Sequence, residues 1–334
     1  MTPTLAGHLD GCLLCRACER ACPSLVAFGR LADGARAARV SALPAWRRTL
    51  RRGLLAALSD ARLTAWLARA AALYRGRGLA WLGRRPLHRI AAAIRSTAAP
   101  IAAAAPTAAD LELFVGCMGA LAQGQAIAAT LELCDALGLR VRVPQAPACC
   151  GALLRHGGFP AEADVRRDAC ARAPDAPPLV GLASACVAEL REAPGSADTW
   201  ELCDFLERRA PWERLTLAPL PERVLVHEPC SHRNLPGGNG AVYRLLGRVP
   251  GLEVLPLPGN ATCCGAAGTY MLEQSAMAES LLADKIAAIA ALRPTTVVTT
   301  NGGCALHLVA GLGAAGSAVR VCHPAELLRR SLRP

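Results

Sequence analysis

The second half of the chain carries one cysteine pattern twice, and this duplication restricts the fold more than any other feature. In each copy a single cysteine precedes a Cys-Cys-Gly triplet, and another single cysteine follows it. The intervals agree, at 32 and 33 residues before the triplet and 36 and 40 residues after it. The first copy contains Cys117, Cys149, Cys150 and Cys186, and the second contains Cys230, Cys263, Cys264 and Cys304. Two matched copies indicate two similar structural units.

Short apolar runs typical of strands alternate with longer helix-like segments around these cysteines. The runs are LELFV (111–115), LRVRV (139–143), PLVGLA (178–183), RVLVH (223–227), LEVLPL (252–257), TTVVTT (295–300) and AVRV (318–321). Such alternation predicts an α/β fold with mostly parallel sheets. We assign residues 111–222 to the first C-C-G repeat and residues 223–334 to the second.

The single cysteines lie just after predicted strands, and the triplets lie in loops before helix-like stretches. In a parallel sheet these loops open on one edge, where ligands bind outside the carboxyl ends of the strands. We therefore expect each set of four thiols, here called a quartet, to gather at that edge and bind metal. Gly151 and Gly265 follow the paired cysteines, where two adjacent ligands need a sharp turn that glycine permits.

Thiolate is a soft ligand that suits iron-sulfur clusters, zinc or cuprous copper. A single triplet is equally explained by buried cysteines without metal or by a vicinal redox disulfide, whereas two matched copies favour metal. Sixteen cysteines in 334 residues is about 5%, under the roughly 8–10% of a disulfide scaffold. The cysteines outside any pattern, predicted to be small buried core residues, are Cys134, Cys170, Cys203 and Cys322.

A second cysteine motif, GCLLCRACERACPS, occupies residues 11–24. Its spacing, C-x-x-C-x-x-C-x-x-x-C-P, is an iron-sulfur signature, and it favours iron-sulfur over zinc for the quartets as well. In two-cluster ferredoxins the fourth cysteine of such a run ligates the other cluster, but this chain has one run. Cys12, Cys15 and Cys18 are expected to bind three irons of a 4Fe-4S cluster. Three roles stay open for Cys22: it binds the same cluster, it binds a cluster in a partner chain, or it binds no cluster. Residues 1–29 form this ferredoxin-like segment.

Residues 30–98 form a basic helical region. Between Arg30 and Ser96 there are 15 arginines and two aspartates, a net charge of +13, so the rest of the +11 chain is slightly acidic. Apolar stripes at helical spacing, the first at Trp46, Leu50, Leu54 and Leu58, predict amphipathic helices whose arginines point away from the stripe. Further stripes run from Leu63 to Tyr74 and from Leu79 to Ile94.

Two interpretations of this region stay open. The arginines form a solvated face of a helical hairpin, or the helices dock on an anionic membrane surface or an acidic partner subunit. Nucleic acid is not expected, because the region lacks a recognised binding motif. The Ala- and Pro-rich stretch 99–110 is typical of a linker. No apolar stretch reaches the roughly 18 residues of a spanning helix, and the first twenty residues lack signal-peptide order, so a cytoplasmic location is expected.

Paired C-C-G repeats behind a ferredoxin-type run resemble the iron-sulfur subunit of bacterial glycolate oxidase, with wider similarity to lactate-utilisation proteins and to the C-C-G-containing subunit of heterodisulfide reductase. CLLCRACERACPS is similar to that family's second ferredoxin run, and CCGAAGTY and NGGCALHL are similar to its C-terminal signature. The resemblance extends from His8 to nearly the end of the chain and is weakest in the arginine-rich region.

The resemblance implies an electron-transfer subunit with 4Fe-4S clusters, one at the N-terminal run and up to one per repeat. An FAD-containing dehydrogenase subunit would oxidise glycolate, or another small 2-hydroxy acid such as lactate, and this chain would relay the electrons toward quinone at the inner face of the cytoplasmic membrane. An additional ferredoxin-type subunit would supply the absent first run. The alternatives are a heterodisulfide-reductase-like thiol/disulfide reductase that uses the clusters catalytically, and an interaction protein without clusters.

Each repeat of the heterodisulfide reductase relatives ends in C-x-x-C, and this chain departs from that pattern. Glu189 stands three residues after Cys186, and His307 three residues after Cys304. His307 either replaces a thiolate as a ligand, donates a hydrogen bond to the ligands, or is an exposed histidine. His227, at a strand end, either tunes a nearby cluster or is a buried histidine with satisfied hydrogen bonds. The absent cysteines favour relay over reductase chemistry.

Overall fold

The computed structural model describes residues 2–73, 93–94, 104–145, 148–193, 196, 198–234 and 238–333. Of the predicted helical stretch from Leu79 to Ile94, only Ala93 and Ile94 belong to these described residues. Residues 99–103 of the predicted linker 99–110 also lie outside them.

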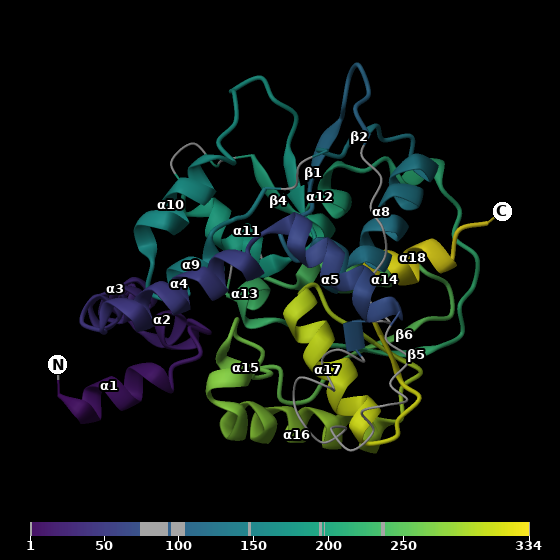
Figure 1. Cartoon of the computed structure of the whole chain (residues 1–334). Helices are drawn as coiled ribbons and strands as arrows, with labels where there is room; N and C mark the ends of the chain where they lie inside the picture. The colour runs from purple at the N-terminus through teal and green to yellow at the C-terminus, as the bar shows by residue number, and fades with distance from the viewer. Residues whose placement is uncertain are drawn as a thin grey trace.

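Each repeat is built on a four-stranded parallel sheet (Figure 1). The first sheet has the order β2-β1-β3-β4 and consists of β1 (Leu111–Phe114), β2 (Val141–Arg142), β3 (Leu179–Gly181) and β4 (Thr199–Glu201). The second has the order β6-β5-β7-β8 and consists of β5 (Arg223–Val226), β6 (Glu253–Pro256), β7 (Thr296–Val298) and β8 (Arg320–Cys322). The register is equivalent in both, with Glu112 opposite Leu179 and Val224 opposite Thr296. The predicted α/β fold with duplicated repeats and parallel sheets is confirmed.

Strand β4 is the one strand of the described sheets that the sequence did not predict. Its residues, Thr-Trp-Glu, form no apolar run. Glu201 is fully buried because its carboxylate caps the next helix, where Oε2 accepts hydrogen bonds from the amides of Cys203 at 2.7 Å and Asp204 at 3.2 Å. Because this edge strand ends in a buried acidic residue that caps a helix, it contains no apolar run by which a hydrophobicity pattern could detect it.

Helices cover both sheets. In the first repeat they are α7 (Gly119–Ala122), α8 (Gly124–Ala136), α9 (Ala152–His156), α10 (Pro160–Asp168), α11 (Ser184–Arg191), α12 (Leu202–Arg209) and the short 3₁₀ helix η2 (Trp212–Arg214). In the second they are α13 (Cys230–Arg233), α14 (Gly240–Leu246), α15 (Tyr270–Glu273), α16 (Ser275–Leu292), α17 (Gly302–Ala314) and α18 (Pro324–Arg330). The last helix of each repeat packs on the other repeat, α18 on α8 and α12 on α14.

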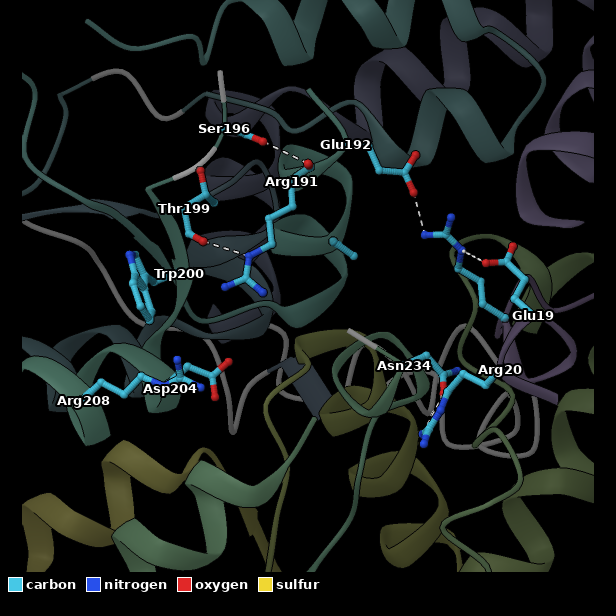
Figure 2. A pocket seen from close by; sticks show the side chains of 12 residues that line it. Glu19, Arg20, Arg191, Glu192, Ser196, Thr199, Trp200, Asp204, Arg208 and Asn234 are labelled. Carbon is cyan, nitrogen blue, oxygen red and sulfur yellow. Dashed lines mark hydrogen bonds and ion pairs between the residues drawn. The ribbon is translucent and has the colours of Figure 1, made fainter. Parts of the chain in front are cut away.

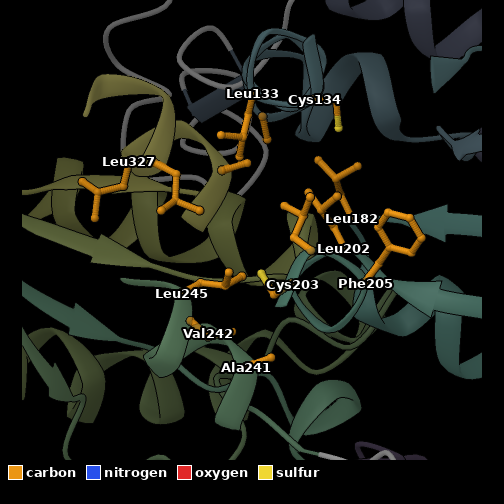
Figure 3. Close-up of a cluster of buried hydrophobic side chains, with 14 of the residues drawn as sticks. Leu133, Cys134, Leu182, Leu202, Cys203, Phe205, Ala241, Val242, Leu245 and Leu327 are labelled. Carbon is orange, nitrogen blue, oxygen red and sulfur yellow. The ribbon is translucent and has the colours of Figure 1, made fainter. Parts of the chain in front are cut away.

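This exchange creates one hydrophobic core across both repeats (Figure 3). Leu133 and Leu202 of the first repeat and Leu245 and Leu327 of the second are fully buried in it. The predicted core cysteines Cys134, Cys203 and Cys322 are buried there too, with at most 3% of their surface exposed. Burial of apolar surface shared by both repeats makes them one folding unit rather than two independent domains.

Residues 2–73 are mostly helical, and α3 (Phe28–Ser41) and α4 (Ala45–Leu58) pack against the first repeat (Figure 1). The other helices are α1 (Pro3–Asp10), α2 (Ala17–Ala21) and α5 (Ala61–Leu73). Val40 of α3 and Leu55 of α4 pack against Leu154 and Phe159 of the first repeat. Helices are thus present along the predicted stripes from Trp46 to Leu58 and from Leu63 onward, as α4 and α5, and both pack on the first repeat.

Helix α4 differs from the expected solvated arginine face in the direction of its apolar stripe. Arg51 donates to the Gly157 carbonyl at 3.2 Å and pairs with Glu273, and Arg52 pairs with Glu162 at 3.0 Å. The apolar stripe instead points outward, with Trp46, Leu50 and Leu54 exposed by 63%, 67% and 58%. Arg51 and Arg52 thus contact the repeats, while Arg47 and Arg48 are exposed beside the uncovered stripe.

Across the ranges that the structure describes, no helix has both the length and the hydropathy needed to cross a membrane.

Candidate metal centres

Both thiol quartets lie at the carboxyl edges of their sheets. Cys117 and Cys230 follow β1 and β5, and Cys186 and Cys304 lie in the first turns of α11 and α17, directly after β3 and β7. The paired cysteines occupy the loops after β2 and β6. Parallel strands place all of these loops on one side, which is why residues up to 74 positions apart in sequence meet.

The first quartet is mostly buried and its sulfurs are in contact. The Sγ atoms of Cys149 and Cys117 are 3.6 Å apart, and Cys150 lies within hydrogen-bonding reach of both Cys149 and Cys186. Cys117, Cys149 and Cys150 are buried, and Cys186 is half-buried. Cys149 thus lies beside Cys117 and Cys150 beside Cys186, and binding of one metal centre by all four thiols stays a prediction.

The second quartet repeats this arrangement. Cys230 and Cys263 have their Sγ atoms 3.9 Å apart, and those of Cys264 and Cys304 are 3.1 Å apart. Cys263, Cys264 and Cys304 are buried, and Cys230 is half-buried. Both separations are short enough for the two thiols of a pair to bind the same metal ion or cluster.

A glycine with positive φ closes each triplet. Gly151 and Gly265 have φ of 89° and 90°, and their amides donate to the Sγ atoms of Cys149 and Cys263 at 3.4 Å. A Cβ at Gly151 would overlap the Ala163 carbonyl oxygen, and one at Gly265 would lie 2.8 Å from that of Ala278. Glycine is required here because the turn is left-handed and a neighbouring helix approaches closely.

Contact between neighbouring thiols shifts their pKa values in opposite directions. Hydrogen bonding from Cys117 and then Cys150 lowers the pKa of Cys149, and contact with Cys149 together with burial raises the pKa of Cys117. Cys263 and Cys230 behave in the same way. One sulfur of each pair is thus a ready thiolate, while full deprotonation of a quartet requires a bound cation. This donor set fits a thiophilic metal or an iron-sulfur cluster.

The second quartet has two basic neighbours. His227 is buried, its Nδ1 is 3.0 Å from Thr299 Oγ1, and the ring lies with Cys264 and Cys304 in a group whose potential ligand atoms are all within 4.8 Å. Burial lowers the pKa of His227 to about 3, so the ring is neutral. Lys285 is 2% exposed, and its Nζ donates to the Gly259 carbonyl. Burial lowers the pKa of Lys285, and the thiolates of Cys264, Cys263 and Cys304 oppose that shift.

Glu189 and His307 stand where the heterodisulfide reductase relatives have the last cysteine of C-x-x-C, and each contacts a group other than a quartet thiol. His307 is buried, and its Nε2 lies 3.3 Å from the Ala278 carbonyl oxygen. Glu189 forms a buried ion pair with Arg155 at 2.5 Å. Ligation by His307 stays a prediction, and the histidine that the structure places beside Cys264 and Cys304 is His227.

The N-terminal run packs against the second repeat. Cys15 interacts electrostatically with Cys263 as well as with Cys12 and Cys18, and burial raises its pKa. Asn234 donates to the Cys15 carbonyl, and the Tyr270 hydroxyl donates to the Gly11 carbonyl at 3.0 Å. These contacts fix the run beside the thiols of a segment more than 200 residues away.

Cys22 lies at the end of α2 and is partly exposed. Hydrogen bonds from the backbone amides of Val26, Ser24 and Leu25 lower its pKa. The thiolate form is thus favoured at a position open to solvent, where a ligand to a neighbouring centre would be accessible.

Sequence reasoning missed residues that surround the quartets. Cys170, predicted to be a core residue, is half-buried and lies 3.7 Å from the Cys149 carbonyl oxygen. Cys170 and Lys285 occupy equivalent positions in the two repeats. Cys170 stands seven residues after Ala163, which lies against Gly151, and Lys285 stands seven residues after Ala278, which lies against Gly265. Aligning the two helices through that spacing would have found both. The Thr64 hydroxyl, which donates to the Cys117 carbonyl, carries no such signal.

The fold and these centres define a class of protein, a duplicated parallel α/β fold with a thiol quartet in each half. The family model described as "Cysteine-rich domain" matches residues 111–191 and 224–309, which is half of the chain. The chain belongs to this cysteine-rich domain family.

Curated relatives extend the match. The chain is 32% identical to lactate utilization protein A of Geobacillus kaustophilus over 234 residues, covering 65% of this chain and 98% of the relative. It is 31% identical to the same protein of Geobacillus thermodenitrificans with the same coverage. Similarity to the glycolate oxidase iron-sulfur subunit of Escherichia coli reaches 28% identity over a 351-residue alignment, covering 97% of this chain and 82% of the relative. The resemblance to the glycolate oxidase iron-sulfur subunit and to lactate-utilisation proteins is confirmed.

Proposed function

We propose that this chain is the iron-sulfur electron-transfer subunit of a complex that oxidises glycolate or another small 2-hydroxy acid such as lactate. Similarity to a glycolate oxidase iron-sulfur subunit over nearly the whole chain and to lactate utilization proteins supports this assignment. Cys12, Cys15 and Cys18 would hold one 4Fe-4S cluster, and each quartet would hold one more. Clusters of this kind take up and release single electrons.

The observation that carries the proposal is the continuity of the three thiol groups. The Cys15 carbonyl of the N-terminal run accepts a hydrogen bond from Asn234, four residues after the quartet ligand Cys230. The two quartets meet at Ser184 and Ser231, whose hydroxyls are 2.7 Å apart and which lie within two residues of Cys186 and Cys230. An electron relay needs such a series of neighbouring centres with water excluded, which burial of the quartets provides.

Relay is favoured over thiol/disulfide reductase chemistry by the surroundings of the quartets. A reductase needs a cavity beside an exposed metal atom. The open cleft of about 610 Å³ beside the first repeat has no cysteine among the described residues that line it. Six of the eight quartet thiols are buried.

The partner that this function requires is an FAD-containing dehydrogenase subunit, which would supply the electrons. Cys22 suits a cluster held by an additional ferredoxin-type subunit, because its thiolate is stabilised by backbone amides and is partly exposed. Electrons would leave toward quinone, which places the complex at the inner face of the cytoplasmic membrane.

Helix α4 is the surface proposed for that peripheral attachment. Trp46, Leu50 and Leu54 form an exposed apolar stripe beside exposed Arg47 and Arg48. Tryptophan and leucine flanked by arginine suit the boundary between headgroups and acyl chains of an anionic bilayer.

The function is tested by purifying the chain anaerobically together with its FAD-containing partner and adding glycolate, lactate or no acid. We expect loss of visible cluster absorbance and a reduced-cluster paramagnetic signal with one of the acids, and neither change when the partner is omitted. A complex that stays oxidised with both acids but is reoxidised by a disulfide after chemical reduction would instead support the reductase.

The membrane surface is tested by sedimentation with vesicles of phosphatidylglycerol and phosphatidylcholine. The triple variant W46S/L50S/L54S should lose at least about tenfold in binding to anionic vesicles, the effect of removing three buried apolar anchors. The control V165S/M277S removes exposed apolar side chains elsewhere and should bind like the unaltered protein. Equal binding of both variants would remove α4 from the proposal.

A further inference from the structure

A second cluster of potential ligands lies apart from the thiol quartets, where the two repeats meet. Glu201 ends β4, Asp204 lies in the first turn of α12, and His232 belongs to α13 of the other repeat. Their exposed fractions are 0%, 6% and 0%. One potential ligand atom from each lies within 4.8 Å of the others, and His232 Nε2 is 3.7 Å from both Glu201 Oε2 and Asp204 Oδ2.

Two of these polar side chains have a buried atom without a partner. The His232 ring is oriented by Nδ1, which lies 2.8 Å from Thr300 Oγ1, and its Nε2 has no hydrogen-bond partner among the described residues. Glu201 Oε1 is likewise buried and without one. A separation of 3.7 Å is too long for a hydrogen bond, so a protonated His232 forms only long ion pairs with the two buried carboxylates. A divalent cation between the three side chains would balance both carboxylates.

The spacing of the group fits a metal ion. Nitrogen and oxygen ligands bind zinc at about 2.0–2.2 Å, which sets ligand atoms of a tetrahedral site about 3.3–3.6 Å apart. The observed 3.7 Å reaches that range with a shift of a few tenths of an ångström. We propose that Glu201, Asp204 and His232 bind one divalent metal ion of the zinc type at the junction of the two repeats.

Charge and surroundings agree with this assignment. Two carboxylates balance a divalent ion, and the His232 imidazole, which gives up its Nε2 proton when it binds the metal, completes a set of nitrogen and oxygen ligands suited to zinc. His323 lies near Glu201 and Cys203, but its Nδ1 accepts a hydrogen bond from the Ala325 amide at 3.1 Å, which leaves the proton on Nε2. His323 thus stands outside the ligand set, and a fourth position stays open.

The site has a route to solvent and a structural consequence. Asp204 lines the cleft of about 610 Å³ together with Arg20, Arg191 and Arg208, so an ion can reach the carboxylate without unfolding (Figure 2). His232 is two residues from the quartet ligand Cys230. A metal joining α12 to α13 would fix the start of the helix that carries Cys230. The proposal does not depend on the electron-relay function.

The test measures metal content of the full chain, purified anaerobically with its clusters, incubated with zinc and freed of excess ion by gel filtration. We expect about one zinc per chain, with zinc-edge X-ray absorption showing nitrogen and oxygen neighbours at about 2.0–2.1 Å. The variants D204N and H232Q should each lower zinc at least about fivefold and leave iron and sulfide unchanged. D135N, at an exposed aspartate on α8, is the matched control and should keep the zinc.

Two results would overturn the proposal. One is the absence of a divalent metal beyond the cluster iron in the unaltered protein. The other is zinc with sulfur neighbours near about 2.3 Å that survives D204N, because such zinc would sit in a thiol quartet. The absorption spectrum of the unaltered protein decides the question even if both variants fail to fold.

Discussion

The two repeats share a frame but differ in what surrounds their thiols. Both have the same strand order, the same left-handed glycine after the paired cysteines and the same buried sulfur contacts. The first quartet is covered by the basic helices and adjoins the uncharged Cys170. The second is covered by the N-terminal run and adjoins Lys285 and His227. Duplication has preserved the ligand positions, while the neighbours that set a cluster's potential have diverged.

The largest effect should come from removing one ligand in one repeat. C150S and C264S alter equivalent buried thiols, and each should lower iron by about four atoms per chain through loss of its own cluster. Iron and sulfide analysis with paramagnetic resonance should show that the other repeat keeps its signal. C134A, at a buried core cysteine, should keep all the iron. A variant that loses iron from both repeats would show that the two centres are not separate.

The next effect concerns the triplet glycines. G151A and G265A should each destabilise the chain by roughly 1–3 kcal/mol, because φ is positive and the new Cβ meets a carbonyl oxygen. The closer approach at Ala163 makes G151A the more destabilising. Anaerobic denaturant unfolding measures both, and G34A on the exposed part of α3, where a Cβ meets nothing within 4 Å, is the control. A G151A protein as stable as G34A would contradict the turn geometry.

Lys285 should separate the potentials of the two centres. Its ammonium favours the more negative, reduced state of a neighbouring cluster, so K285M should lower the midpoint potential of the second centre by on the order of 50–100 mV, the effect of one charge at about 7–14 Å and an effective dielectric constant near 20. Redox titration followed by paramagnetic resonance measures the shift. C170S, at the equivalent position of the first repeat, should move neither potential by more than a small fraction of this. If K285M leaves the midpoint potential of the second centre unchanged, the charge of Lys285 is not the cause of a difference between the two centres.

The smallest effect is expected at Ser59, which ends α4. Its hydroxyl is buried, has no nitrogen or oxygen partner among the described residues, and lowers the pKa of Cys149. S59A should lower the first potential by about 20–60 mV, the equivalent of one hydrogen bond worth about 0.5–1.5 kcal/mol. S41A, at an exposed serine on α3, is the control in the same titration. A shift confined to the second centre would be inconsistent with this contact.

The frame of the molecule was predictable because it depends on local patterns. Apolar runs located seven strands, and strand-end cysteines located both quartets, since parallel strands bring such positions to one edge. Strand β4 escaped because a buried Glu201 breaks the apolar pattern. The outward face of α4 could not be foreseen, because it depends on acidic partners such as Glu162 that are distant in sequence. The junction of Glu201 with His232 has the same origin, since no motif links residues that only the packing of one repeat on the other brings together.

The central claim is that both quartets hold iron-sulfur clusters. It is tested most directly in the full chain carrying C12S, C15S and C18S, purified anaerobically, where any remaining iron must come from the repeats. We predict about eight iron and eight sulfide per chain, the content of two 4Fe-4S clusters. Zinc in place of iron, or iron and sulfide near zero, would contradict the account.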